Sequence, residues 1–114
     1  MNERSRQSQL PDSEVFDLAA LVDYADAAVV SRTLRKAAGG TVTLFAFDAG
    51  QELSEHTAPF DALVHVLDGE GQFVIAGQAH TVKTGQVILM PANVPHAVSA
   101  NKRFKMFLTM LKNN

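Results

Sequence analysis

Hydrophobic and polar positions alternate most clearly over residues 104–111, near the C-terminal end of the chain. One set of alternate positions is entirely apolar: Phe104, Met106, Leu108 and Met110. The intervening set includes polar residues: Lys105, Phe107, Thr109 and Leu111. Successive side chains of a β-strand point to opposite faces, so the pattern predicts a strand whose first set faces the interior and whose second set faces solvent.

Similar short apolar segments recur along the chain and are separated by glycines. The sequence predicts strands over residues 28–35, 41–47, 54–57, 62–67, 72–76, 80–83 and 86–90. Many short strands joined by turns are typical of an all-β sandwich or barrel. Before the first strand, Asp12 or Ser13 is a suitable N-cap for a short helical segment that contains Phe16 and Leu21.

Length and composition indicate a single globular domain. The chain has 114 residues, of which 46% are hydrophobic and 19% charged, which is enough for one compact core. Residues 1–10 are polar and lack periodicity, so we expect a flexible tail there and one barrel domain over residues 11–114. A net charge of −2 gives no electrostatic case for nucleic acid or an anionic membrane.

The absence of cysteine and of long apolar runs bears on the cellular compartment that we expect for the protein. With no cysteine there are no disulfides and no thiolate chemistry, which fits a cytoplasmic protein. No stretch approaches 18 uninterrupted apolar residues, so we expect neither a membrane span nor a secretory signal.

Two histidines, each inside a longer pattern, are the candidate functional residues. His56 lies within residues 50–69, which begin at Gly50 and end at Gly69, and His96 lies within residues 85–100, after Pro91. These two segments resemble the paired sequence motifs of the cupin superfamily, in its single-domain conserved-barrel form. The resemblance implies a small double-stranded β-helix, or jelly-roll, barrel.

The resemblance also locates the family's metal-ligand positions, which are three histidines and one glutamate. Here they fall on His56, Ala58, Ala62 and His96, so two of the four are alanine. Two neutral imidazoles without a carboxylate should hold a divalent cation weakly, with Cu(II) or Ni(II) held best. We therefore expect either no cofactor or a weakly held divalent transition metal on His56 and His96.

No nearby acidic or imidazole side chain is a good substitute for the missing ligands. Glu52 shares strand parity with His56 but lies about 13 Å along the strand at ~3.3 Å per residue. Glu55 and His65 should point to the opposite face if their strands are regular. A β-bulge would reverse any of these assignments.

The favoured hypothesis is a small-molecule-binding protein, since two alanines make the cavity wider and more apolar. His56 and His96 would supply polar contacts, with Phe47, Phe60, Met90 and Met106 as the lining. The alternative is a metal-dependent enzyme, resembling dioxygenase or isomerase cupins, that uses the same histidines. Whether the protein is an enzyme, and what its ligand is, stay open at this point.

Apolar residues are more numerous than one small barrel interior can hold. The surplus comprises Phe107, Leu111, Val29, Val30, Leu63 and Val66. A sheet with two apolar faces usually buries the second one, so we expect a homodimer packed sheet on sheet, which is also common in the cupin superfamily. A third possibility is that this surface, and not the cavity, carries the function.

Overall fold

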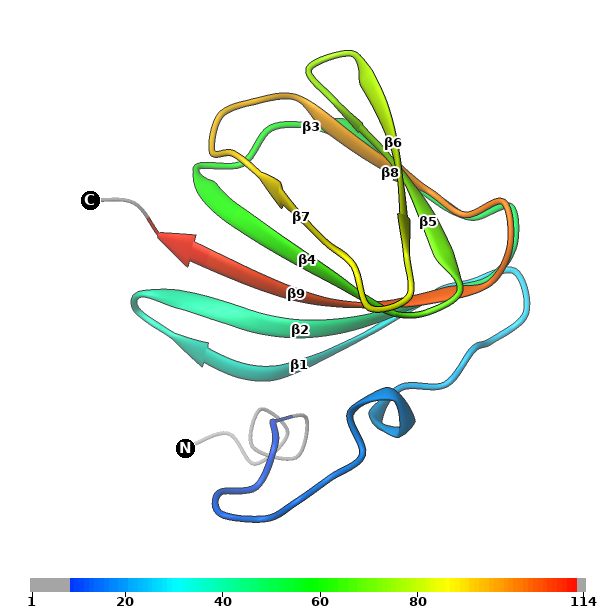
Figure 1. The fold of residues 1–114 in the computed structure, drawn as a ribbon. Coiled ribbons are helices and arrows are strands. Elements are labelled where there is room, and N and C mark those ends of the chain that lie inside the picture. Colours follow the sequence, from blue (N-terminus) through cyan, green and yellow to red (C-terminus); the bar gives the residue numbers. More distant parts are fainter. Residues whose placement is uncertain (1–8, 113–114) are drawn as a thin grey trace.

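The computed structural model describes residues 9–112, and within them nearly all regular structure is β-strand (Figure 1). Within these residues a single short helix, η1, spans Leu18–Leu21. The strands are β1 (Val29–Ala37), β2 (Gly40–Phe47), β3 (Glu52–His56), β4 (Phe60–Asp68), β5 (Glu70–Ile75), β6 (Gln78–Lys83), β7 (Val87–Met90), β8 (His96–Ser99) and β9 (Phe104–Lys112). The predicted all-β jelly-roll barrel is confirmed.

Two antiparallel sheets enclose the core. One has the strand order β1-β2-β9-β4-β7 and the other β3-β8-β5-β6. Side chains from both sheets are completely buried between them, including Phe47, Val64 and Phe73. On β9, Phe104 and Met106 are buried as the alternation predicted. No helix in the part of the chain described is long and apolar enough to cross a membrane.

The N-terminal helical segment differs from the prediction. It is one turn of 3-10 helix that begins after Asp17, whose side chain makes no capping hydrogen bond. Neither Asp12 nor Ser13 caps it, and Ser13 has a φ of 61°, which turns the chain before a helix can start. Of the tail expected over residues 1–10, residues 1–8 lie outside the described part, and Leu10 donates a backbone hydrogen bond to Leu34.

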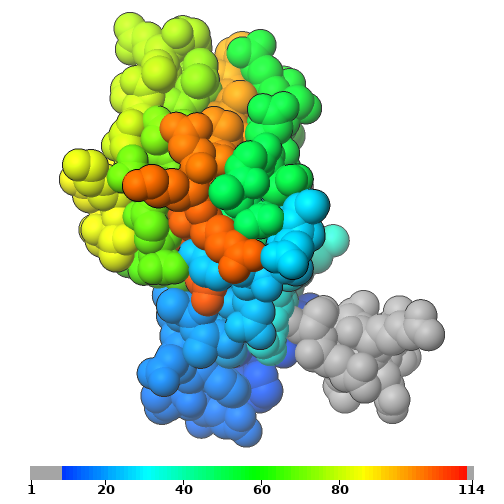
Figure 2. All heavy atoms as spheres, turned by 90° about the vertical axis from the view of Figure 1, so that its right-hand side faces the viewer, coloured from blue at the N-terminus to red at the C-terminus, as the bar shows by residue number. Residues whose placement is uncertain are grey.

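The segment before β1 covers part of the outer face of the five-stranded sheet. Figure 2 shows these residues, in blue, at the bottom of the view beneath the strands. Leu18 and Leu21 pack on a second buried cluster that includes Leu44, and Val30 and Phe107 join it from the sheet. Val30 and Phe107 are therefore covered by the N-terminal segment of the same chain, so they are no evidence for a dimer interface. Two other apolar residues that were expected on the outer surface belong to the barrel interior. Val66 is fully buried there, and Val29 packs against the core between the two sheets.

The rest of that outer face stays exposed. Its large apolar side chains are Leu63 on β4, Val87 and Leu89 on β7, and Leu111 on β9. Leu63 and Leu89 are directly paired across β4 and β7, so they lie side by side on one face. β7 is also an edge strand of its sheet. The homodimer stays a prediction, and this surface is where we expect it.

Leu89→Glu should therefore convert a dimer into a monomer, because it places a charge in the centre of the apolar surface. The molar mass measured by light scattering checks this. The matched control is Val15→Glu, at a fully exposed position on the N-terminal segment, which should leave the mass of the dimer unchanged. A wild-type chain that runs as a monomer would contradict the prediction.

Polar contacts fasten the N-terminal segment to the barrel. The Tyr24 hydroxyl donates a hydrogen bond of 2.5 Å to Asp68, and Arg103 and Lys105 lie over the Tyr24 ring at 5.3 and 5.1 Å. Arg103 also pairs with Asp26 at 2.8 Å. Tyr24 thus joins the segment to β4 and β9 at one point.

Tyr24 should titrate well above pH 10 in the folded protein. Burial and the hydrogen bond to Asp68 raise its pKa above the ordinary value near 10. The resulting contribution to stability is fully present below about pH 10 and is lost as the pH rises toward the folded pKa. Because Tyr24 is the one tyrosine in the chain and there is no tryptophan, the ultraviolet absorbance of its phenolate reports on this group alone. Asp68→Asn should lower the midpoint, and a wild-type midpoint near 10 would contradict the assignment.

Candidate functional site

His56 and His96 meet at one end of the barrel. They are paired residues of the neighbouring strands β3 and β8. Their ring centroids are 4.4 Å apart with an interplanar angle of 68°. The side chain of His96 is 5% exposed, whereas His56 is exposed. The site is therefore buried at His96 and open to solvent at His56.

A β-bulge in β3 sets the direction of His56. Leu53 pairs with Val98 and His56 with His96, so three steps on β3 match two on β8. The extra residue lets Leu53 and His56 face the same side in spite of their odd spacing. The expected shared parity of Glu52 and His56 is therefore wrong, since Glu52 pairs with Ser99 and is exposed. Within the described residues no group of three or more histidine, cysteine or acidic side chains could hold a metal ion.

The loop before β8 positions His96. The backbone N–H of Asn93 donates to Ala58 O at 2.8 Å, and Ala92 N–H donates to the Asp61 carboxylate at 2.9 Å. Asn93 has a φ of 63°, a left-handed conformation that asparagine tolerates better than most residues. These contacts join the loop before β8 to the connection between β3 and β4 and to the start of β4.

Backbone carbonyls fix the orientation of both imidazole rings. The Nδ1 atom of His56 lies 2.8 Å from Ser54 O, and Nδ1 of His96 lies 3.1 Å from Val94 O. A carbonyl oxygen only accepts hydrogen bonds, so each Nδ1 must carry the proton and donate. In the neutral rings, Nε2 then has a free lone pair. Each histidine therefore offers one nitrogen that can accept a hydrogen bond or bind a metal.

A small apolar cavity of about 70 Å³ adjoins the two rings. Apart from the histidines, every lining residue is apolar: Leu53, Ala58, Ala62, Met90, Val98, Met106, Leu108 and Met110. The sequence interpretation placed Met90 and Met106 in this wall, and the structure does the same. It missed Leu53, which the bulge concealed, and Val98, which lies on a strand that was not predicted. It also missed Leu108 and Met110, whose shared parity with Met106 was the available signal.

Phe47 and Phe60 lie outside the cavity, contrary to the expected lining. Phe47 is fully buried and stacks on Phe104 with ring centroids 4.6 Å apart. Phe60, at the start of β4, lines a separate groove with Gly40 and Met110. Parity gave the face of the sheet correctly but not the level along the barrel at which each side chain lies.

The sequence model of the Cupin domain family matches residues 43–110. The chain belongs to the cupin family. None of the curated proteins matches this cupin. Among solved structures, a conserved protein of unknown function from Streptococcus pyogenes is 35% identical, with a TM-score of 0.88 over 93% of both chains. A cupin 2 conserved barrel domain protein from Leptotrichia buccalis is 42% identical, with a TM-score of 0.83 over 85% of this chain and 47% of that one.

A more distant solved structure extends the likeness to the fold alone. Salicylate 1,2-dioxygenase from Pseudaminobacter salicylatoxidans is 17% identical, with a TM-score of 0.67 over 72% of this chain and 26% of that one. At this level of identity, the shared feature is the barrel.

The donor set of this cupin does not fit the family's four-ligand divalent site. Ala58 and Ala62 line the cavity next to the histidines, at the positions where an imidazole and a carboxylate would be needed. The cavity wall carries no carboxylate, so a buried divalent cation would keep both of its charges uncompensated. The residues present supply two neutral imidazoles on a hydrophobic surface.

Proposed function

We propose that this cupin is a binding module that takes a small molecule at the His56–His96 cavity. The observation that carries the proposal is the pair of Nε2 atoms left free beside an apolar wall, because both Nδ1 atoms donate to backbone carbonyls. A few convergent polar groups on an apolar surface are the usual chemistry of a small-molecule site.

The size of the cavity limits the ligand. About 70 Å³ is well below the ~300 Å³ of the smallest usual drug-sized sites. The ligand, or the part of it that enters, should have few non-hydrogen atoms. An O–H or N–H group would donate to an Nε2 atom, and an apolar portion would contact Met90 and Met106. Because His56 is exposed, a larger ligand can extend past it into solvent.

Methionine methyl groups give a direct test. The chain has four methionines, and Met90, Met106 and Met110 all line the cavity. Protein labelled with ¹³C at the methionine methyls is titrated with a panel of small alcohols, phenols and carboxylic acids. Binding in the cavity should shift these three resonances together.

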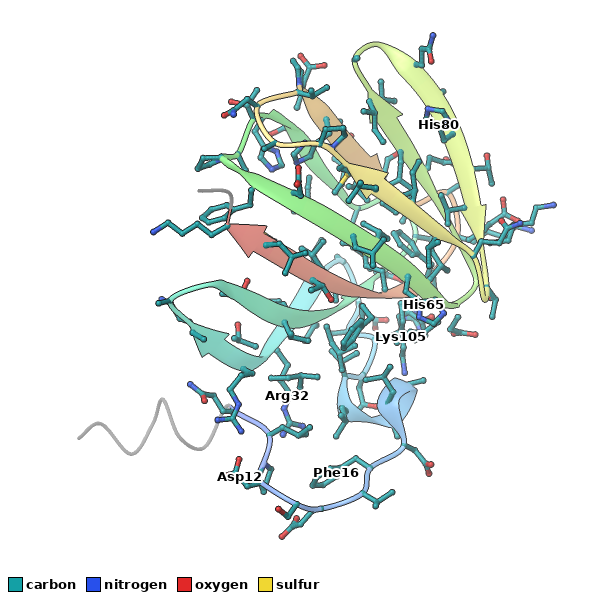
Figure 3. All side chains as sticks on the ribbon, turned by 60° about the vertical axis from the view of Figure 1, so that its left-hand side comes forward. Asp12, Phe16, Arg32, His65, His80 and Lys105 are labelled. Atoms are coloured by element: carbon teal, nitrogen blue, oxygen red, sulfur yellow. The ribbon has the colours of Figure 1, made fainter. Side chains whose placement is uncertain are left out.

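The histidine variants complete that test. His56→Ala and His96→Ala should each weaken the binding of a hit by about tenfold, the effect of losing a hydrogen bond worth ~1.4 kcal/mol. His80→Ala is the matched control, because His80 lies on β6 and is exposed (Figure 3). Hits that shift none of the three cavity methionines, or that bind both histidine variants as well as the wild type, would refute the proposal.

A metal-dependent enzyme is the alternative function. It would use the same two histidines, but two of the family's four ligand positions hold alanine, and no described histidine, cysteine or acidic side chain replaces them. The binding role is therefore the one that the donor set supports better.

A further inference from the structure

Three thioethers share the cavity with the two histidines. Met90 and Met106 are 3% and 1% exposed, and Met110 is half-buried. Ala62 pairs with Met90 on one neighbouring strand and with Met110 on the other. Directly paired residues of adjacent strands project from the same face. Met90, Ala62 and Met110 therefore form a row across β7, β4 and β9, with a methionine on each side of the small alanine.

The donors in this cavity are all uncharged. They are two imidazole Nε2 atoms and up to three thioether sulfurs, and none of the lining residues is an aspartate, glutamate or cysteine. The cost of burying an ion without counter-charge rises with the square of its charge, so a monovalent cation costs about a quarter as much as a divalent one of the same size. Thioethers are soft ligands and select Cu(I) among the biological transition metals.

The spacing of the rings suits one shared ion. Two imidazoles that bind the same ion through Nε2 at about 2.0 Å and the tetrahedral angle have ring centroids about 5 Å apart. The observed separation is 4.4 Å, so the rings need to move apart by less than ~1 Å to share an ion. The Nδ1 hydrogen bonds to backbone carbonyls are the outer contacts that commonly hold metal-binding histidines in the right tautomer.

We propose that the cavity is a Cu(I) site formed by His56 and His96 with at least one thioether from Met90, Met106 and Met110. The inference rests on the proposed function, that this cavity is a binding site, and names a soft monovalent cation as its ligand. It differs from the four-ligand divalent site of other cupins both in the donor atoms and in the charge of the ion.

The test is a competition titration of the full-length protein with Cu(I) under reducing, oxygen-free conditions. A chromophoric Cu(I) chelator, bathocuproine disulfonate, reports how much copper the protein removes. We expect one Cu(I) per chain and binding at least about a hundredfold tighter than that of Zn(II) measured in parallel. Zn(II) binding that equals or exceeds Cu(I) binding would overturn the proposal.

Methionine variants separate a copper ligand from a core side chain. Met90→Leu, Met106→Leu and Met110→Leu nearly conserve volume and should fold. At least one of them should weaken Cu(I) about tenfold or more, and the triple variant should bind no better than His56→Ala. His65→Ala is the control, since His65 pairs with Phe107 on the outer face of its sheet (Figure 3), and its affinity should not change. If the triple variant binds Cu(I) as tightly as the wild type, the thioethers are not ligands and the proposal is wrong.

Two readouts distinguish this inference from the function on which it rests. X-ray absorption of the copper-loaded chain should show sulfur as well as nitrogen neighbours; nitrogen and oxygen alone would overturn the site. If small organic molecules shift the methionine methyls but Cu(I) does not bind, the copper inference fails and the proposed function stands. If neither binds, both fail.

Discussion

Adding the two missing ligands in Ala58→His/Ala62→Glu should create a tight divalent metal site. Both alanines line the cavity beside His56 and His96, so the variant supplies a third imidazole and a carboxylate. We expect Ni(II) affinity to rise by at least about a hundredfold, because even outer contacts of a metal change affinity by 10–100-fold. Calorimetric titration with Ni(II) measures the gain.

A control variant separates the effect of the added negative charge from the effect of the shape of the new side chain. Ala58→His/Ala62→Gln has nearly the same shape without the negative charge, so its Ni(II) affinity should fall between those of the wild type and the glutamate variant. Equal affinity of the glutamate variant and the wild type would mean that these two positions do not converge on the histidines.

Phe104→Ala should lower the free energy of unfolding by about 3–5 kcal/mol, a large part of the ~5–15 kcal/mol that stabilises a typical domain. Phe104 is fully buried, stacks on Phe47 at 4.6 Å and meets Phe73 edge to face at 6.1 Å. Its ring also lies over Gly71, where an added Cβ would come within 2.7 Å of it. Removing the ring would leave a large void at the centre of the barrel.

Urea denaturation followed by circular dichroism measures this loss. Val15→Ala is the control, since Val15 is fully exposed on the N-terminal segment and its truncation should change stability by no more than about 0.5 kcal/mol. A loss below about 1 kcal/mol in Phe104→Ala would show that the barrel collapses around the void.

The strands could be predicted because their pattern is local. The alternation over residues 104–111 gave the correct inward set on β9, including Met106. β8 was missed because its four residues, His96–Ser99, follow directly on the motif loop, and no glycine separates the strand from the loop. The cover over Phe107 was also missed, since its packing on residues near Leu18 depends on where the chain returns in space.

The candidate site was predictable in its residue types but not in all its geometry. The motif spacing identified His56 and His96, and the structure brings their rings together. Strand parity predicted the wrong face for Glu52 relative to His56, because no residue type in the sequence indicates the β-bulge between them. It failed for Phe47 for another reason: Phe47 pairs with Phe104 at the start of β9, whereas Met110 of the cavity lies near the end of that strand.

The bulge in β3 bears on how related sequences should be compared. Losing either Ser54 or Glu55 would restore regular pairing between Leu53–Val98 and His56–His96, and the imidazole would still face inward. The loss of one residue there is therefore nearly neutral for the orientation of the ring. Searches that demand a fixed interval between Gly50 and this histidine would pass over homologues that keep the same pocket with one residue fewer.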